Sequence, residues 1–141
     1  MRIWHNRGTA FEGTEVSVTP HPGFMTDFQP LAVLFDCFTQ GENIVVENPL
    51  ATNIGYIQEL NKHGAKIEIE RNLDSIQIKI AGPTAFKSGK INVNDLRYAL
   101  VSLLFALSVE GQNELAGFDI IENGFDDIVE KIKSIGGRIV E

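Results

Sequence analysis

The sequence predicts a mixed α/β (α+β) protein in which β-sheets pack over buried helices. Segments that alternate apolar and polar residues, such as 66–70 and 76–80, indicate strands, whereas segments with apolar residues three or four positions apart indicate helices. The order of these segments occurs twice along the chain. With 141 residues, of which 43% are hydrophobic and 22% charged, the chain is long enough to form a substantial core.

Charge and composition exclude several classes of partner. The formal net charge is -7 and no run of Lys or Arg is present, so we expect no nucleic-acid partner. The longest apolar run, residues 98–109, is shorter than a membrane span and predicts a buried helix rather than a membrane contact. The N-terminus lacks the apolar core of a signal peptide, and Cys37, the single cysteine, has apolar neighbours. Together these features predict a cytoplasmic protein with a buried thiol.

The first helix is predicted from its start and stop signals. Residues 15–19 alternate with period two and indicate a strand before it. Thr26 and Gln29 form a Thr-x-x-Gln capping box and Gly41 is a typical C-cap residue, so we expect a helix from Asp27 to about residue 40. The predicted inward face of this helix consists of Phe28, Leu31, Leu34, Phe35 and Phe38.

The other elements follow from the same patterns. In the first half we expect an edge strand at Ile3 and Trp4, a strand at 43–47, a loop at 48–52, a helix at 53–63 ended by Gly64, and a β-hairpin at 66–80 with its turn at 71–75. In the second half we expect a helix from Asn94-Asp95 to about 109, a strand within 115–121, a helix that follows Gly124-Phe125 and buries Ile128, Ile132 and Ile135, and a last strand beginning at 138–140.

The two halves form an internal repeat. The predicted helix starts at Thr26 and Asn94 are 68 residues apart, and each half has the order β-α-β-α-β. We therefore expect a single domain, 1–141, with internal repeats at about 14–82 and 83–141. Because the helices are apolar on more than one side, we expect them to lie inside, with sheets around them.

The stretch from His21 to Asp27 is the first candidate for chemistry. Asp27 falls in the first turn of the predicted helix, where the helix dipole favours an ionised carboxylate. Such a carboxylate can take a proton from a bound hydroxyl or hydrogen-bond it, and it can also serve only to balance the dipole. The three histidines, His5, His21 and His63, lack the spacing of a metal site, so we expect surface or turn residues and no metal.

The repeat, together with His-Pro-Gly-Phe-x-Thr-Asp at 21–27, resembles the UDP-N-acetylglucosamine enolpyruvyl transferases (1-carboxyvinyltransferases) of peptidoglycan biosynthesis. The weaker anchors of the resemblance are Glu59-Leu60, Gly64-Ala65, Asp95-Leu96-Arg97, Gly124-Phe125, and Glu130-Lys131 with Gly136. The resemblance implies an inside-out α/β barrel, enolpyruvyl transfer from phosphoenolpyruvate to UDP-N-acetylglucosamine, and no cofactor. The family's enzymes are much longer, and the chain resembles only their C-terminal third.

The resemblance also implies roles for individual residues. Asp27 resembles the carboxylate that contacts the sugar 3-hydroxyl and is the proposed general base, with Thr26 beside it. Pro49 falls where the family offers a backbone contact to the sugar nucleotide. Arg97 resembles an arginine that binds the phosphate or carboxylate of phosphoenolpyruvate, a role that suits a planar guanidinium, and Asp95 could orient it.

Departures from the family pattern leave two functional hypotheses. Lys133 stands where the family has a second phosphoenolpyruvate arginine, and Ala51-Thr52-Asn53 replaces a Glu-Asn-Arg motif. The catalytic loop belongs to a domain that this chain does not resemble, so we expect the chain to be inactive alone. The first hypothesis is a truncated or split enolpyruvyl transferase that keeps one substrate wall. The alternative is a non-catalytic ligand-binding or assembly module on the same scaffold, and an unrelated α/β domain is a third possibility.

The expected architecture also predicts association. The family domain contains three such units, whereas this chain has two. Sheet edges and helix faces that the third unit would cover are then open, and open edges favour pairing with another chain. We therefore expect a homo-oligomer or a partner chain that supplies the missing unit.

Overall fold

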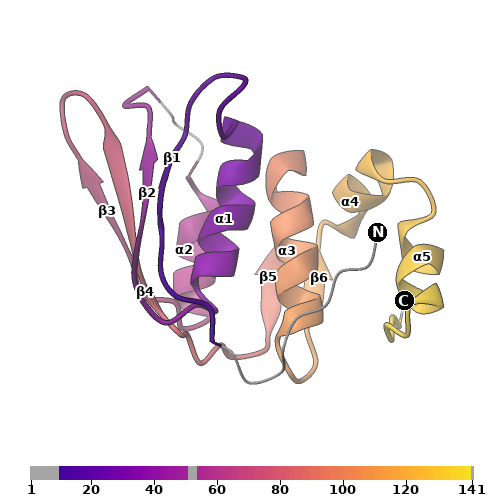
Figure 1. Cartoon of the computed structure of the whole chain (residues 1–141). Helices are drawn as coiled ribbons and strands as arrows, with labels where there is room; N and C mark the ends of the chain where they lie inside the picture. Colours follow the sequence, from indigo (N-terminus) through magenta and orange to yellow (C-terminus); the bar gives the residue numbers. More distant parts are fainter. Residues whose placement is uncertain (1–9, 51–53, 141) are drawn as a thin grey trace, which may run out of the picture. The chain divides into compact units, whose positions relative to one another are not determined.

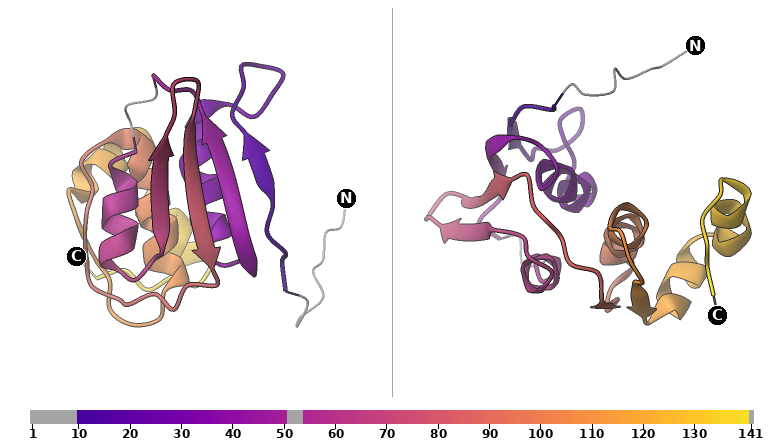
Figure 2. Two further views of the ribbon diagram at one scale, coloured as in Figure 1. Left: turned by 90° about the vertical axis from the view of Figure 1, so that its left-hand side faces the viewer. Right: turned by 90° about the horizontal axis from the view of Figure 1, so that it is seen from below.

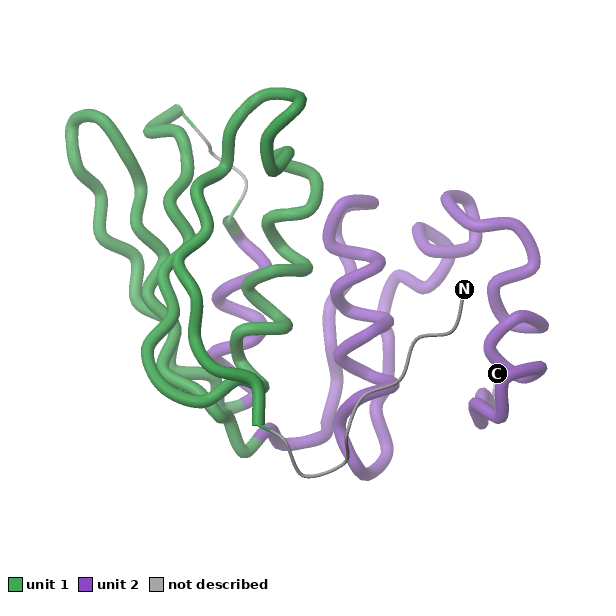
Figure 3. Tube along the Cα trace, in the orientation of Figure 1, with its two compact units in different colours: residues 1–54, 64–85 green, residues 55–63, 86–141 purple. Residues whose placement is uncertain are grey.

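The computed structural model describes residues 10–50 and 54–140, which form two compact units (Figures 1 and 3). Unit 1 comprises Met1–Ile54 and Gly64–Ala85, and unit 2 comprises Gly55–His63 and Phe86–Glu141. Helix α2 (Tyr56–Lys62) therefore belongs by its contacts to unit 2, although the strands before and after it belong to unit 1. The edge strand predicted at Ile3 and Trp4 lies outside the described residues.

Unit 1 contains a four-stranded sheet (Figure 2, left). Its strands are β1 (Glu15–Ser17), β2 (Gly41–Glu47), β3 (Ile67–Arg71) and β4 (Ile76–Gly82), in the order β1-β2-β4-β3. β1 is parallel to β2, whereas β2–β4 and β3–β4 are antiparallel. These strands and the hairpin agree with the sequence prediction, because each has the period-two pattern of a half-buried strand.

One face of this sheet is buried beneath α1 (Gln29–Asp36), which lies against β2 and β4 (Figure 1). Val45 of β2 pairs with Ile78 of β4, and both side chains are fully buried. Val33 and Cys37 from the helix side are also fully buried. The prediction of a buried thiol at Cys37 is therefore confirmed.

The first helix begins and ends differently from the prediction. Thr26 lies inside a short 3-10 helix, η1 (Thr26–Phe28), and no side chain caps α1 within the described part of the chain. The N-cap residues of η1 and α1 are Met25 and Phe28, so Thr26 is not the capping residue that the sequence predicted. α1 ends at Asp36, whose carbonyl accepts bonds from the Thr39 N–H at 3.3 Å and the Asn43 side-chain amide at 3.4 Å. These bonds compete with continuation of the helix.

The inward face predicted for this helix is wrong at three positions. Phe28, Phe35 and Phe38 are 48%, 50% and 40% exposed. Leu34 is buried, as predicted, and the other buried residues of the helix and its C-cap are Gln29, Pro30, Val33, Asp36 and Cys37. The helix carries apolar residues on two sides, and its spacing does not specify which side meets the sheet.

Unit 2 is mainly helical. Its two short strands, β5 (Lys90–Asn92) and β6 (Glu114–Ala116), are parallel. Its other helices are α3 (Leu96–Ser108), α4 (Phe118–Gly124) and α5 (Ile128–Ser134). A core cluster of this unit consists of Val93, Ala99, Leu103, Ile121 and Ile132. No helix in the described ranges is long and apolar enough to cross a membrane.

Several predictions for this half are corrected by the structure. The strand expected within 115–121 ends at Ala116, because Gly117 has a left-handed φ of 86° and α4 begins directly after it. The order β-α-β-α-β implies a strand before the helix at Asn94 without giving its bounds, and β5 lies there. Residues 138–140 form no strand although the structure describes them. Ile135, predicted to be buried, is largely exposed at the end of α5.

The long apolar helix is buried on only part of its circumference. Val101, Leu103 and Phe105 of α3 are buried, as predicted. Leu104 and Leu107 are exposed, so the prediction of a fully buried helix is wrong for this side. Together with the exposed face of α1, this pattern means that each unit presents an apolar helix surface. The sheet of unit 1 is open, without closure into a barrel.

Candidate functional site

The N-terminus of α3 orders two of the predicted site residues. Asp95 is the N-cap, and its Oδ1 accepts the Arg97 backbone N–H at 2.8 Å. The same carboxylate accepts from Arg97 Nε at 3.1 Å and from Nη2 at 3.1 Å. A carboxylate that is itself fixed as a helix cap thus holds the guanidinium plane through two bonds. The Arg97 side chain is 53% exposed, so a solute can reach it.

The three predicted sugar-nucleotide residues lie in unit 1. Thr26 and Asp27 are exposed in η1, with Asp27 in its first turn. Pro49 follows β2 in a turn in which Asn48 Oδ1 accepts the Leu50 N–H at 2.9 Å. This Asx-type bond shapes the backbone on both sides of Pro49.

Lys133, the sixth predicted residue, lies on α5 of unit 2 and forms an ion pair with Glu130, with Nζ and Oε1 3.7 Å apart. Hydrogen bonds and an ion pair thus join Asp95 to Arg97, whereas Lys133 pairs within its own helix. Residues 51–53, where the Glu-Asn-Arg motif is replaced, lie outside the described residues.

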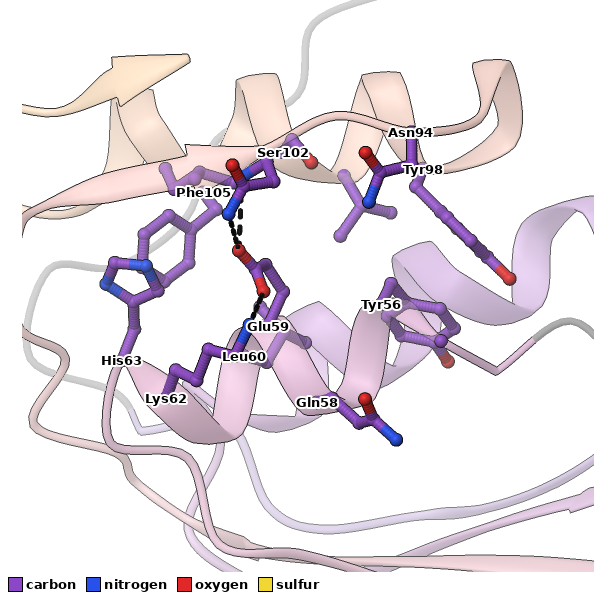
Figure 4. A pocket seen from close by; sticks show the side chains of 14 residues that line it. Tyr56, Gln58, Glu59, Leu60, Lys62, His63, Asn94, Tyr98, Ser102 and Phe105 are labelled. Carbon is purple, nitrogen blue, oxygen red and sulfur yellow. Dashed lines mark hydrogen bonds and ion pairs between the residues drawn. The ribbon is translucent and has the colours of Figure 1, made fainter. Parts of the chain in front are cut away.

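Unit 2 also contains a pocket of about 320 Å³ that α2, β5 and α3 line (Figure 4). Tyr56 and Tyr98 lie at one end, with ring centroids 5.2 Å apart, and His63 and Phe105 lie at the other. Between them, Glu59 bonds to Asn92 and to Lys62. The volume is at the lower end of the range for small-molecule sites.

His21 and His63 both lie in turns, in agreement with the expectation of surface or turn residues. His21 is exposed, whereas His63 is buried. Its Nδ1 lies 2.8 Å from the Lys87 carbonyl oxygen and its Nε2 lies 3.2 Å from that of Lys90. Both partners are acceptors, so a neutral ring donates to one of them, and this bond helps the ring to tolerate burial. His5 lies outside the described residues.

Sequence reasoning did not predict that Glu59 and His63 both lie against the strand at 90–92. Their separation of four residues on a predicted helix places them on one face, and this was the available signal. Their partners, Asn92 and Lys90, are 33 and 27 residues away in the sequence, so the spacing alone could not reveal the contact.

Comparison with known proteins places this chain in one family. Residues 2–132 match the EPSP synthase (3-phosphoshikimate 1-carboxyvinyltransferase) family, and the chain belongs to that family. Among its relatives are UDP-N-acetylglucosamine 1-carboxyvinyltransferases. The enzyme of Legionella pneumophila (strain Lens) is 29% identical over 128 residues, which are 91% of this chain and 24% of the relative. The enzyme of Kosmotoga olearia is 32% identical over 124 residues, which are 88% of this chain and 28% of the relative.

A solved structure agrees with these relatives. The enolpyruvyl transferase NikO from Streptomyces tendae has a TM-score of 0.79 and 25% identity, and the match covers 93% of this chain and 29% of NikO. The resemblance carried by residues 21–27 and the later anchors is therefore confirmed. The chain spans only about a quarter to a third of the length of the relatives that it matches.

Proposed function

We propose that the chain provides one wall of an enolpyruvyl-transfer site. The observation that carries the proposal is the Asp95–Arg97 pair, in which a helix-capping carboxylate fixes an exposed guanidinium at the N-terminus of α3. A guanidinium has five N–H donors in one plane, and a helix N-terminus favours anions. This arrangement suits the phosphate or carboxylate of phosphoenolpyruvate.

On unit 1, we propose that Thr26, Asp27 and Pro49 contact UDP-N-acetylglucosamine. Asp27 would accept the proton of the sugar 3-hydroxyl as general base. Its exposure in the first turn of η1 supports this role, because a bound hydroxyl can approach the carboxylate directly. Pro49 would offer its backbone to the sugar nucleotide.

Lys133 would supply a second cation for phosphoenolpyruvate. Its ammonium group keeps the positive charge of the arginine that it replaces but lacks the planar fork. We therefore expect a phosphoenolpyruvate affinity weaker than that of a site with two arginines. Because the chain spans a quarter to a third of its relatives, we also expect no turnover by these 141 residues alone.

Nuclear magnetic resonance titration of the isotope-labelled chain tests this proposal. Phosphoenolpyruvate should shift the Arg97 side-chain and backbone resonances, and Arg97→Lys should weaken this binding by about tenfold, because the fork is lost. UDP-N-acetylglucosamine should shift resonances near Thr26 and Asp27, and Asp27→Ala should abolish those shifts. The exposed variant Asp74→Ala, in the turn between β3 and β4, is the matched control. Absence of shifts at millimolar ligand would overturn the proposal.

The alternative function, an assembly module, is favoured by exposed apolar side chains on unit 1. These side chains are 39% to 50% exposed and belong to Phe11, Met25, Phe28, Phe35 and Phe38. The rings of Phe11 and Phe35 meet edge to face, with centroids 5.2 Å apart. Exposed apolar surface of this kind marks protein interaction sites where it is contiguous. We propose that the exposed Phe11–Phe35 pair binds a second copy or a chain that supplies a further unit.

Light scattering at micromolar concentration tests the association. The native chain should be larger than a monomer, and Phe35→Ser should shift it toward the monomer. Leu73→Ser, at an exposed apolar residue in the hairpin turn, is the control and should leave the mass unchanged. A monomeric native chain would contradict self-association.

A further inference from the structure

We propose that Glu59, on α2, is a positioning residue for the anion-binding end of α3. It holds the open edge of β5, the strand that leads directly to Asp95 and Arg97. The inference rests on the proposed function in one respect, the assignment of Arg97 as a ligand contact. The hydrogen-bond geometry that supports it stands independently of any ligand.

β5 has one paired edge and one open edge. The Val93 N–H donates to the Ala116 carbonyl at 2.8 Å, and the Glu114 N–H donates to the Gly89 carbonyl at 3.0 Å. Because backbone groups of successive strand residues point to opposite sides, Lys90 and Asn92 face away from β6. An open edge presents unpaired N–H and C=O groups that a fold must satisfy or protect.

α2 supplies a partner for this open edge. Glu59 Oε1 accepts the Asn92 backbone N–H at 3.1 Å and its side-chain Nδ2–H at 2.8 Å. One helical turn later, at the C-cap of α2, His63 Nε2 lies 3.2 Å from the Lys90 carbonyl oxygen. Glu59 thus bonds to the edge where a further strand would pair, and His63 lies beside the same edge. Dashed lines in Figure 4 mark the bonds of Glu59.

Two neighbouring residues stabilise the charged form of the Glu59 carboxylate. Its side chain is 15% exposed, and Lys62 Nζ lies 2.6 Å from Oε2. Burial alone would raise the pKa of Glu59, but the hydrogen bonds from Lys62 and Asn92 outweigh burial and lower the pKa below its usual value. Hydrogen bonds to a charged acceptor are stronger than those between neutral groups, so we expect strong hydrogen bonds between Glu59 and Asn92.

Only a few residues separate the Glu59–Asn92 contact from Arg97. Val93 follows Asn92 and is both buried and bonded to β6. Asn94 is then the single residue between this fixed segment and Asp95, the cap that orients Arg97. Displacement of Asn92 therefore changes the position from which Asp95 presents its carboxylate. Glu59 acts on Arg97 through the strand and the helix cap.

The experiment compares Glu59→Ala, Glu59→Gln and the control Glu70→Ala, which removes an exposed carboxylate paired with Lys79 on unit 1. The ligand-free readout is hydrogen exchange of the Arg97 Nε–H, which Asp95 protects. The second readout is phosphoenolpyruvate affinity. Glu59→Ala should accelerate the exchange and weaken binding by about fivefold, within the range of coupling through a contiguous network. Glu59→Gln should restore part of both, because its amide oxygen can still accept from Asn92.

The outcomes separate this inference from the proposed function. Faster exchange of the Asn92 amide in Glu59→Ala, with the Arg97 Nε–H unchanged, would mean that Glu59 serves only the strand edge and would overturn the inference. Absence of phosphoenolpyruvate binding by the native chain would overturn the proposed function, while the Arg97 exchange would still decide the inference. Glu59→Gln carries the same comparison if Glu59→Ala does not fold.

Discussion

The Thr39 hydroxyl donates a hydrogen bond to Asn43 Oδ1 over 3.0 Å, and both residues are almost completely buried. The same amide oxygen accepts the Thr14 backbone N–H at 3.0 Å. One side chain of β2 therefore ties the segment after α1 to the chain just before β1. This bond explains how a polar residue occupies an inward position of the central strand, because its acceptor is fully used.

We expect Asn43→Ala to lower the free energy of unfolding by about 2–3 kcal/mol, because the Thr14 N–H loses its acceptor and the Thr39 hydroxyl keeps only the Asp36 carbonyl oxygen, at 3.0 Å. Guanidinium chloride unfolding, followed by circular dichroism, measures the change. Glu42→Ala, at the exposed neighbouring position, is the control. A loss no larger in Asn43→Ala than in the control would contradict the prediction.

We expect ionisation of Asp36 to lower the free energy of unfolding as the pH rises. The side chain is 2% exposed, its Oδ2 has no hydrogen-bond partner among the described residues, and burial raises its pKa from 3.8 to about 6. The unfolded chain releases this proton at lower pH than the folded chain. The stabilising contribution of the protonated group is therefore complete below about pH 4 and is lost as the pH rises through about 6.

We expect Asp36→Asn to be more stable than the native chain at about pH 8, by up to about 3 kcal/mol, and equal to it below about pH 4, since one pKa unit corresponds to 1.36 kcal/mol. Urea unfolding across this pH range provides the test. Asp74→Asn, in the exposed hairpin turn, should show no such difference. A gain in Asp36→Asn that does not depend on pH would show that its cause is not ionisation.

The Cys37 thiol should resist modification in the folded chain. It is fully buried, and burial raises its pKa to about 12. Thiol reagents react with the thiolate, so at about pH 8 we expect reaction only through opening of unit 1. A second thiol introduced by Ser108→Cys, at an exposed position, should react rapidly in the same molecule. Equal rates for the two thiols would be inconsistent with this prediction.

Gly117 should not accept a side chain. Its φ is 86°, and an added Cβ would lie 2.4 Å from the Val93 carbonyl oxygen. We expect Gly117→Ala to destabilise the chain by about 2 kcal/mol or more, because both the backbone conformation and the contact oppose it. Gly55→Ala is the matched control, since Gly55 has helical dihedral angles and no atom within 4 Å of its Cβ position. Thermal unfolding of the two variants compares them directly.

The elements that the sequence predicts correctly are those with local signals. The alternation in residues 76–80 gives β4, and the glycines at 64 and 111, both with positive φ, follow helices as expected. The predictions that failed concern short or ambiguous segments. β5 and β6 have three residues each, too few for a periodic pattern, and they become strands because they pair with each other.

The candidate site divides in the same way. The motif at 21–27 and the Asp95–Arg97 spacing are local, so the sequence predicted the family and a helix that opens at Asn94-Asp95, and the structure makes Asp95 the N-cap. The contact between Glu59 and Asn92 joins residues 33 positions apart, and the burial of His63 depends on carbonyl groups of a different segment. Neither could be predicted from spacing within one element.

The sequence by itself determined the α/β class, the four strands of unit 1 and a helix that opens at Asn94-Asp95, because alternation, glycine stops and helix-start residues act within a few residues. Only the tertiary structure decided that Phe28, Phe35 and Phe38 lie on the exposed side of the helix region. Only the tertiary structure assigned α2 to unit 2, with Glu59 against β5. The reason is that the choice between two apolar helix faces, or between possible hydrogen-bond partners, depends on long-range packing that no local pattern encodes.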